Sequence, residues 1–431
     1  MKPPAGSSEL AGYVTDVPYV YGFKPMLAPA WLDLVAVLGG VSPPARDTGF
    51  AWCDLGCGQG VTAAILAATH PTGTFHGIDA MPAHIEHAAR LAAEADAPNA
   101  HFHATDFAAA RLLPLPRFDY IVAHGVYSWV DRPVRAELRR FIDGHLKSGG
   151  LVYVSYNALP GWTGDLPFQH LVRELVADLP GNSAARFAAA AALVGCLAEA
   201  GAPSLAASFV ANELRRDLKE IGLVPVGSAL LVENFDGWVL GRRARGLVAG
   251  IADPDRREMV RDFCIDQRFR CDVFARDASP LTASKQRERL MSSGLALVRP
   301  PAAITYEMPT PAGRVRYDNP AARAIIASLM SGVRRLADIP SGFAAARDLI
   351  ANMLVLCAAG DVRPTETTRT PVGPLNRALR RRLGKAEEVP AVALPCGTAL
   401  DIDQDIVRLL SGADAGGMSA DWREFLELHG V

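Results

Sequence analysis

The sequence has no excess of charge of either sign. Its 431 residues include 44 lysines and arginines against 46 aspartates and glutamates, which gives a formal net charge of -2. A protein that is drawn to nucleic acid or to an acidic membrane by its overall field carries a strong positive excess. We therefore expect neither nucleic acid nor a membrane as a partner.

Long hydrophobic runs are also missing, although half of the residues are hydrophobic. The N-terminus, with Pro3, Pro4 and Glu9, has no apolar stretch of the length that a secretory signal peptide needs. The most apolar later run, residues 187 to 198, is too short to cross a bilayer. These absences predict a soluble, cytoplasmic protein.

Cysteine is scarce and scattered. The chain has seven cysteines, an odd number, and the nearest pair is Cys53 and Cys57. Histidine or cysteine partners at the spacing of metal ligands are missing. We therefore expect reduced thiols and no metal site.

What the sequence does have is a glycine-rich turn after an apolar strand. Residues 50 to 61 run from apolar side chains to Asp54 and then to Gly56, Gly58 and Gly60. Alternate glycines let the backbone turn sharply and approach a ligand that a Cβ atom would exclude, and the following helix offers free N–H groups to an anion. A dinucleotide fingerprint would need a further small residue at Val61, so a nicotinamide cofactor is disfavoured.

Two further acids come at the ends of the next two predicted strands. Asp79 ends the strand at residues 74 to 79, and Asp106, with Phe107 beside it, follows the strand at residues 101 to 105. Asp54 suits an ammonium group, Asp79 could bind ribose hydroxyls, and Asp106 could accept from an adenine amino group. Each feature alone is ordinary loop chemistry, but the ordered set predicts S-adenosylmethionine as the cofactor.

The order of predicted elements indicates an α/β fold. Strands at residues 50 to 54, 75 to 79, 101 to 105, 119 to 123 and 151 to 156 alternate with helices at 61 to 69, 82 to 95 and 133 to 146, after a first helix at 32 to 38. This alternation predicts a doubly wound parallel sheet, with its ligand crevice at the carboxyl ends of the strands. Residues 1 to 165 would form this domain.

The rest of the chain has a different pattern. Residues 166 to 299 show helical spacing at 166 to 179, 184 to 200, 204 to 220 and 256 to 267, with a short strand pair at 223 to 235, and predict a mostly helical middle domain. Residues 300 to 431 suggest a winged-helix-like domain from helices at 320 to 337 and 343 to 359. Its basic stretch, residues 363 to 385, is more typical of a solvated face than of a DNA reader.

The segment before the first helix, residues 11 to 31, is rich in aromatic side chains and proline. Leaving so much aromatic surface exposed is unfavourable, so we expect this segment to cover the cofactor crevice as a lid. Tyr13 and Tyr19 would reach the ligand. Simple packing against the domain is the alternative.

Two motifs extend beyond a generic fold. The sequences His-Gly-Val-Tyr-Ser-Trp at residues 124 to 129 and Tyr-Asn-Ala-Leu-Pro-Gly-Trp at 156 to 162 resemble bacterial methyltransferases that carry a methyltransferase regulatory domain. The block Arg-Asp-Phe at 261 to 263 with Arg-Phe-Arg at 268 to 270 is similar to theirs as well. The resemblance implies a class I, Rossmann-like methyltransferase. Its relatives among rickettsial enzymes, which methylate lysines of outer-membrane proteins, imply a protein-lysine acceptor and a homodimer.

Candidate residues for the acceptor side follow the fourth and fifth strands. His124 would lie beside the cofactor, Tyr127 and Trp129 could hold an alkyl-ammonium group or a ring by their faces, and Asn157 could align the acceptor nitrogen. Capping of the strand end by His124 and core packing of Trp129 are the alternatives. Two other functions also stay open: methylation of a small molecule or sugar, and a non-catalytic protein that binds S-adenosylmethionine and a partner.

Overall fold

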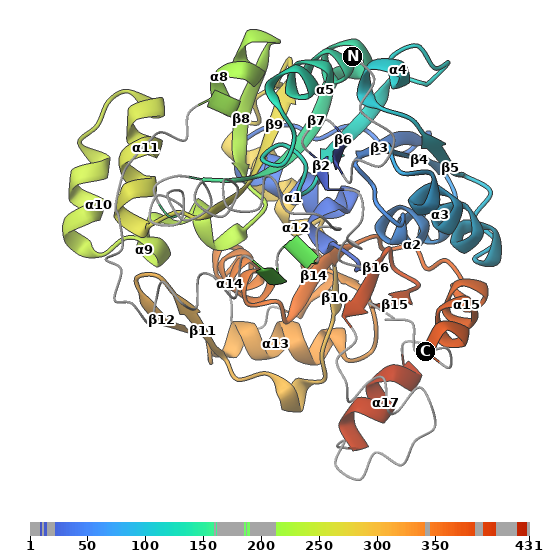
Figure 1. Ribbon diagram of the computed structural model, residues 1–431. Coiled ribbons are helices and arrows are strands. Elements are labelled where there is room, and N and C mark those ends of the chain that lie inside the picture. The colour runs from blue at the N-terminus through green and yellow to red at the C-terminus, as the bar shows by residue number, and fades with distance from the viewer. Residues whose placement is uncertain are drawn as a thin grey trace.

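A seven-stranded sheet forms the centre of the protein (Figure 1). The computed structural model describes residues 9–10, 13–14, 22–158, 161, 185–186, 188–189, 213–340, 345–383, 391–401 and 420–428. The strands of the sheet, in spatial order, are β5 (Ala100–Ala104), β4 (Gly73–Asp79), β3 (Phe50–Leu55), β6 (Phe118–Ala123), β7 (Leu146–Asn157), β9 (Phe269–Arg276) and β8 (Leu223–Ser228).

The first five of these strands are parallel and the chain crosses between them through helices. The order β5-β4-β3-β6-β7 starts at the centre with β3, moves outward to β5, and then returns to build the other half. The connecting elements are α2 (Val61–Thr69), α3 (Pro82–Glu94), α4 (Phe107–Ala110) and α5 (Arg132–His145), after α1 (Pro29–Leu38). The predicted doubly wound parallel sheet is confirmed.

Local sequence explains these elements. All six residues of β3 are buried, as expected for a central strand that is covered on both faces. Helix α5 begins at Asp131, whose side chain accepts from Val134 N, and proline at the second helical position fits the first turn. Helix α2 begins after Gly60, at φ 71°.

Two strands that the sequence did not place in this sheet complete it. Strand β9 pairs antiparallel with β7, and β8 pairs antiparallel with β9. The sheet therefore extends to residue 276, beyond the proposed boundary at residue 165. Within the expected helical region, the structure describes α8 (Glu213–Glu220), η2 (Leu231–Asn234), α9 (Asp236–Val239), α10 (Arg242–Ala249) and α11 (Pro254–Ile265). The helices expected at 166 to 179 and 184 to 200 lie almost wholly outside the described residues.

The C-terminal part contains a separate three-stranded antiparallel sheet in the order β13-β10-β14. Its elements are α12 (Ala283–Met291), β10 (Gly294–Leu297), η3 (Pro301–Ala303), the hairpin of β11 (Glu307–Thr310) and β12 (Gly313–Arg316), α13 (Pro320–Leu329), β13 (Arg334–Arg335), η4 (Leu336–Asp338), α14 (Ala346–Ala359), β14 (Val362–Thr365), α15 (Gly373–Leu383), the hairpin of β15 (Ala391–Leu394) and β16 (Thr398–Asp401), and α17 (Ala420–Leu428). A winged helix is not confirmed, because α14 is followed by the single strand β14, which pairs with β10, and then by a helix.

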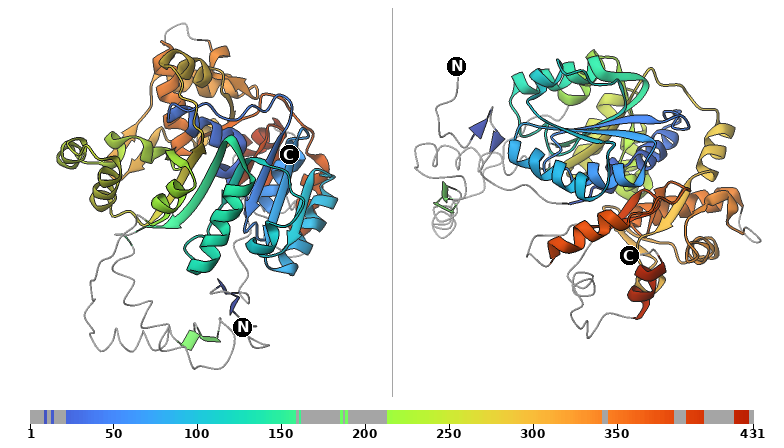
Figure 2. Two further views of the ribbon diagram at one scale, coloured as in Figure 1. Left: turned by 90° about the horizontal axis from the view of Figure 1, so that it is seen from above. Right: turned by 90° about the vertical axis from the view of Figure 1, so that its right-hand side faces the viewer.

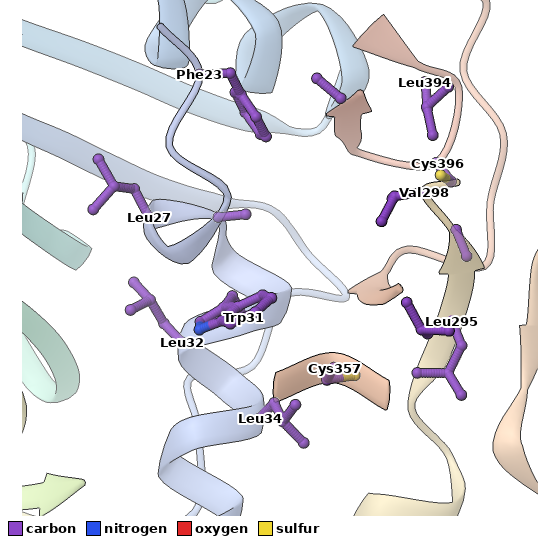
Figure 3. Packing of buried hydrophobic residues seen from close by; sticks show 14 of the residues in the cluster. Phe23, Leu27, Trp31, Leu32, Leu34, Leu295, Val298, Cys357, Leu394 and Cys396 are labelled. Carbon is purple, nitrogen blue, oxygen red and sulfur yellow. The ribbon is translucent and has the colours of Figure 1, made fainter. Parts of the chain in front are cut away.

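The C-terminal part packs against one face of the large sheet. In the right-hand view of Figure 2 its orange and red elements lie together on one side of the blue strands. They contact the helices of that face: β14 meets α1, the β15–β16 hairpin meets α2, and α15 meets α3. Figure 3 shows the shared core, in which Leu34 on α1 lies near Cys357 on α14 and Leu295 on β10. The opposite face carries α4, α5 and α8 over a second hydrophobic cluster.

A cluster of partly buried polar side chains ties these two parts together. Arg46 binds Asp33 of α1 at 2.8 Å and also pairs with Glu366, which follows β14. His70, at the end of α2, lies 3.6 Å from the same carboxylate, and Tyr120 of β6 donates to Asp33 at 2.7 Å. Burial raises the pKa of Glu366, but the nearby imidazole of His70 and the charge of Arg46 outweigh it and lower the pKa to about 2. In the described ranges, none of the helices combines the length and the apolar character that crossing a membrane requires.

Candidate active site

The glycine turn connects the central strand β3 to helix α2. Gly56, Gly58 and Gly60 all have positive φ, at 84°, 54° and 71°, so each takes a conformation that other residues rarely adopt. A Cβ atom on Gly60 would lie 2.4 Å from the side chain of Ala88, whereas one on Gly58 would meet nothing within 4 Å. Gly60 therefore packs against α3, and Gly58 borders open space.

Asp54 is a buried carboxyl with an unsatisfied oxygen. Its side chain is 5% exposed, and its Oδ1 atom has no hydrogen-bond partner among the described residues. Burial, and then the negative charge of nearby Asp79, raise the pKa of Asp54 to about 8. A buried polar atom without a partner is unfavourable in a folded protein, and such atoms occur where a ligand completes the set of contacts.

Asp79, at the end of β4, holds the glycine turn in place. Its Oδ2 atom accepts from Gly58 N at 2.9 Å, and its Oδ1 atom accepts from Met81 N at 2.9 Å and lies 3.3 Å from Nδ1 of His84. The carboxylate is 6% exposed. It therefore positions the turn, and its Oδ2 atom, which accepts one hydrogen bond, has further acceptor capacity for a ligand hydroxyl.

Asp106 and Phe107 lie at the end of the next strand, β5. Asp106 is the N-cap of α4 and its Oδ1 atom accepts from Ala109 N at 2.8 Å. Its side chain is exposed, and Phe107 is partly buried against the cluster below α4 and α5. Both residues lie at the same carboxyl edge of the sheet as Asp54 and Asp79.

His124 follows β6 and is fixed by a neighbouring tyrosine. Its Nδ1 atom lies 2.9 Å from the hydroxyl oxygen of Tyr153 on β7, and the two rings are stacked with centroids 5.9 Å apart. The same hydroxyl group donates to Sδ of Met26 at 3.2 Å. Burial, and then the charge of Lys24, lower the pKa of His124 to about 4, so the imidazole is neutral at physiological pH.

Tyr127 was expected over the ligand-binding edge, but the structure places it elsewhere. Its side chain is 4% exposed and lies in the hydrophobic cluster below α4, α5 and α8. Its hydroxyl group donates to Asp217 of α8 at 2.6 Å, and the guanidinium of Arg135 lies 5.1 Å from the ring centroid. These contacts give Tyr127 a structural role. Trp129, two residues later, is 57% exposed.

Asn157 ends β7 beside the start of β9. Its backbone pairs with Phe269, and its N–H group donates to Oγ of Ser128 at 2.7 Å. Phe269 is 36% exposed and meets His124 edge to face, with ring centroids 6.2 Å apart. Residues at the ends of β6 and β7 and at the start of β9 thus come together at one edge of the sheet.

Comparison with known proteins decides the family. Residues 53–152 match the family model described as a methyltransferase domain, and residues 206–276 match the one described as a predicted methyltransferase regulatory domain. An uncharacterized protein of Synechocystis, sll1526, is 31% identical over 357 residues, which cover 76% of this chain and 71% of that protein. The chain belongs to the methyltransferases with a regulatory domain.

Rickettsial proteins are also similar to this methyltransferase. The uncharacterized protein RP028 of Rickettsia prowazekii is 32% identical over 165 residues, which cover 37% of this chain and 62% of that protein. The structure of PKMT2 from Rickettsia typhi in complex with AdoHcy has a TM-score of 0.62 at 18% identity, and the match covers 95% of this chain and 90% of that chain. That likeness shows a shared fold over nearly the whole methyltransferase, including the C-terminal part.

Residues 22 to 31 of the N-terminal segment pack into the core of the methyltransferase. Phe23 and Leu27 are buried in the core, Trp31 donates to the carbonyl of Ala229 at 2.9 Å, and Lys24 N donates to Oγ1 of Thr62 at 3.1 Å. Residues 22 to 31 are therefore a fixed layer beside the start of α2. Tyr13 lies in the short strand β2 (Tyr13–Val14), which pairs with β1 (Glu9–Leu10), and Tyr19 lies outside the described residues.

The arginine block of the regulatory domain forms a buried ion-pair cluster. Arg270 on β9 contacts Asp272 at 3.1 Å and Glu258 at 2.7 Å and also pairs with Asp262, while Arg215 of α8 contacts Asp272 at 3.2 Å. Burial raises the pKa of Asp272, but the charges of Arg270 and Arg215 outweigh it and the pKa is lowered. This cluster joins α8 and α11 to the sheet of the methyltransferase. The spacing of the arginines in the sequence does not identify these partners.

Proposed function

We propose that this chain transfers a methyl group from S-adenosylmethionine to an amine, with protein lysine as the acceptor class. S-adenosylmethionine supplies an activated methyl group on a positively charged sulfur. Methyl transfer to an amine requires an aligned, unprotonated nitrogen and little further acid or base chemistry. The residues at the carboxyl edge of the sheet can align an amine, and the reaction needs no strong base among them.

The observations that support the cofactor best are the unsatisfied oxygen of Asp54 in β3 and the open space at Gly58 in the turn that follows β3. An α-ammonium group would donate to Oδ1 of Asp54 and would favour the ionised carboxylate. Asp79 would bind the ribose hydroxyls through its remaining acceptor capacity, and Asp106 with Phe107 would hold the adenine ring. The donor and acceptor types present therefore fit S-adenosylmethionine.

On the acceptor side we propose Asn157, Trp129 and Phe269 as the residues that receive the amine. Asn157 and Phe269 are backbone partners at the edge of the sheet, and Phe269 contacts His124. The exposed rings of Trp129 and Phe269 suit an alkyl chain that ends in an amine. We exclude Tyr127 from this set because Asp217 already binds its hydroxyl group.

The test is to label a lysate of the native host with tritiated S-adenosylmethionine and the purified protein, and to separate proteins from small molecules. We expect label in the protein fraction, on lysine side chains. The matched control is Gly58→Asn, because asparagine tolerates the left-handed conformation and its side chain would occupy the open space beside Gly58. Label only in small molecules would favour a metabolite acceptor, and labelling that is equal with the control variant would contradict the proposed site.

A further inference from the structure

The interaction of His124 with Tyr153 has a chemical consequence that cofactor binding alone does not require. We propose that His124 is a catalytic residue whose Nε2 atom accepts a hydrogen bond from the N–H group of the amine acceptor, and that Tyr153 is the positioning residue that fixes its tautomer. This inference rests on the proposed function, because it assigns a role toward the acceptor of that reaction.

The proposed tautomer depends on where the Tyr153 hydroxyl group places its proton. A tyrosine hydroxyl has one proton, and in this proposal it is donated to Sδ of Met26, 3.2 Å away, rather than to Nδ1 of His124. The contact of 2.9 Å between Nδ1 of His124 and the Tyr153 oxygen is then a hydrogen bond only if Nδ1 carries the imidazole proton. In a neutral imidazole with Nδ1 protonated, Nε2 has a free lone pair.

The charge state of His124 suits this role. Burial and the nearby charge of Lys24 disfavour the imidazolium form. A neutral ring accepts a hydrogen bond and does not repel a sulfonium cation. An imidazolium ring has no lone pair with which to accept, and its positive charge would repel the sulfonium. The environment therefore keeps His124 in the form that an acceptor of hydrogen bonds needs.

The position of His124 also agrees with this role. Asp54 pairs with Val122 across β3 and β6, and His124 lies two residues beyond Val122, so His124 and Asp54 share one face of the sheet at its carboxyl edge. Phe269 contacts the ring of His124 from the β9 side and remains 36% exposed. An alkyl amine that packs against Phe269 would thus bring its nitrogen next to the imidazole.

The reaction balances without a base that becomes protonated. The amine enters after losing its extra proton to solvent. Its lone pair forms the nitrogen–carbon bond to the methyl group while the carbon–sulfur bond breaks, and the electron pair of that bond stays on sulfur. The nitrogen becomes positively charged during this step, so its N–H donates more strongly to Nε2 of His124. An interaction that strengthens in the transition state accelerates the reaction.

Nitrogen NMR of histidine provides a test that does not depend on turnover. The protein is labelled with ¹⁵N-histidine, and the resonances of His124 are assigned by their loss in His124→Leu. We expect the Nδ1–H tautomer in the wild-type protein with and without S-adenosylhomocysteine. In Met26→Leu, the Tyr153 hydroxyl group loses its sulfur acceptor and should donate to Nδ1 instead, which converts His124 to the Nε2–H tautomer. An Nε2–H tautomer in the wild type would overturn the proposal.

Single-turnover transfer of a tritiated methyl group to the host protein fraction is the second measurement. We expect His124→Leu to lower the rate about 100-fold, the range for losing one interaction with a developing charge. His124→Gln, whose amide oxygen can accept, should recover part of this loss. Met26→Leu and Tyr153→Phe should each lower the rate about 10-fold, and Tyr153→Phe combined with His124→Leu should be no slower than His124→Leu alone.

The control is the affinity for S-adenosylhomocysteine measured by calorimetry, which should stay within about twofold of the wild type in every variant. Rates within twofold of the wild type in His124→Leu would overturn the proposal. A wild-type protein that labels no product at all would refute the proposed function and this role together. The wrong tautomer in a protein that labels normally would refute only the role of His124.

Discussion

Replacing Asp54 with asparagine should stabilise the ligand-free protein. The carboxyl is 5% exposed, its Oδ1 atom lacks a partner among the described residues, and its pKa is about 8 against 3.8 for an ordinary aspartate. Because the folded pKa is raised, stability is greatest below about pH 4 and is lost as the pH rises toward 8. At pH 7 this loss is at most about 4 kcal/mol, from roughly three pH units at about 1.4 kcal/mol each.

Thermal unfolding of ligand-free wild-type protein and Asp54→Asn at pH 4 and pH 7.5 measures this effect. The variant should unfold at a higher temperature at pH 7.5, and the difference should shrink at pH 4, where the folded wild-type carboxyl is protonated and the unfolded one is about half protonated. The matched control is Asp79→Asn, which loses an acceptor for the N–H groups of Gly58 and Met81 and should unfold at a lower temperature. An Asp54→Asn variant that is no more stable than the wild type at pH 7.5 would refute the reasoning.

Three further changes test contacts that hold the turn, the loop after β6 and the C-terminal part in place. Gly60→Ala should destabilise the fold by about 2 kcal/mol or more, measured by urea unfolding, because the added carbon would lie 2.4 Å from a side chain of α3; an unchanged midpoint would contradict that contact. Tyr127→Phe should lose about 2 kcal/mol of stability with its bond to Asp217 and keep the wild-type turnover, and a loss of turnover would return this residue to the acceptor site. Glu366→Gln should remove up to about 3 kcal/mol at pH 7, because the pKa of about 2 means that the stability due to this carboxylate is present above about pH 4.5 and is lost as the pH falls. If the stability of this variant falls as much between pH 5 and pH 2.5 as that of the wild type, the loss in acid is not caused by Glu366 or by its pair with Arg46.

The part of the site built from consecutive residues could be predicted from the sequence. Asp54, Gly56, Gly58 and Gly60 belong to one strand and one turn, and Asp79 ends the neighbouring strand, so their common edge follows from the parallel order alone. The sequence signal was the apolar strand that ends at an acid and three alternate glycines. The sequence pattern was sufficient to predict this part of the site because its residues lie in one turn and on neighbouring strands.

Contacts between distant segments could not be predicted in this way. Tyr127 and Asp217 are 90 residues apart, and a loop tyrosine gives no sign of whether it faces a ligand or a helix on the other side of the sheet. The same applies to Met26 and Tyr153, which are 127 residues apart and are proposed to fix the tautomer of His124 together. Both sets depend on how the faces of the sheet are covered, and this is a tertiary property.

For a related reason strand β9 was missed, and the strand expected from residue 223 was not assigned to this sheet. Strand β8 contains Pro225 and Gly227, and β9 contains Arg270 and Asp272, so neither has the apolar pattern of a buried strand. The charges of β9 are acceptable inside the protein because α8 and α11 supply partners. A strand that contains buried, paired charges is therefore not recognised from its hydrophobic pattern.

The most direct test of the cofactor site compares two ligands by calorimetry. S-adenosylhomocysteine and 5′-methylthioadenosine share the adenosine and the thioether, but only the first has the amino acid group that Asp54 is proposed to bind. We expect Asp54→Asn to weaken binding of S-adenosylhomocysteine by about 1.5–3 kcal/mol, the range for a hydrogen bond to a charged group, and to leave the affinity for 5′-methylthioadenosine unchanged. Wild-type protein that fails to bind S-adenosylhomocysteine, or a variant that loses affinity for both ligands equally, would contradict the proposed site.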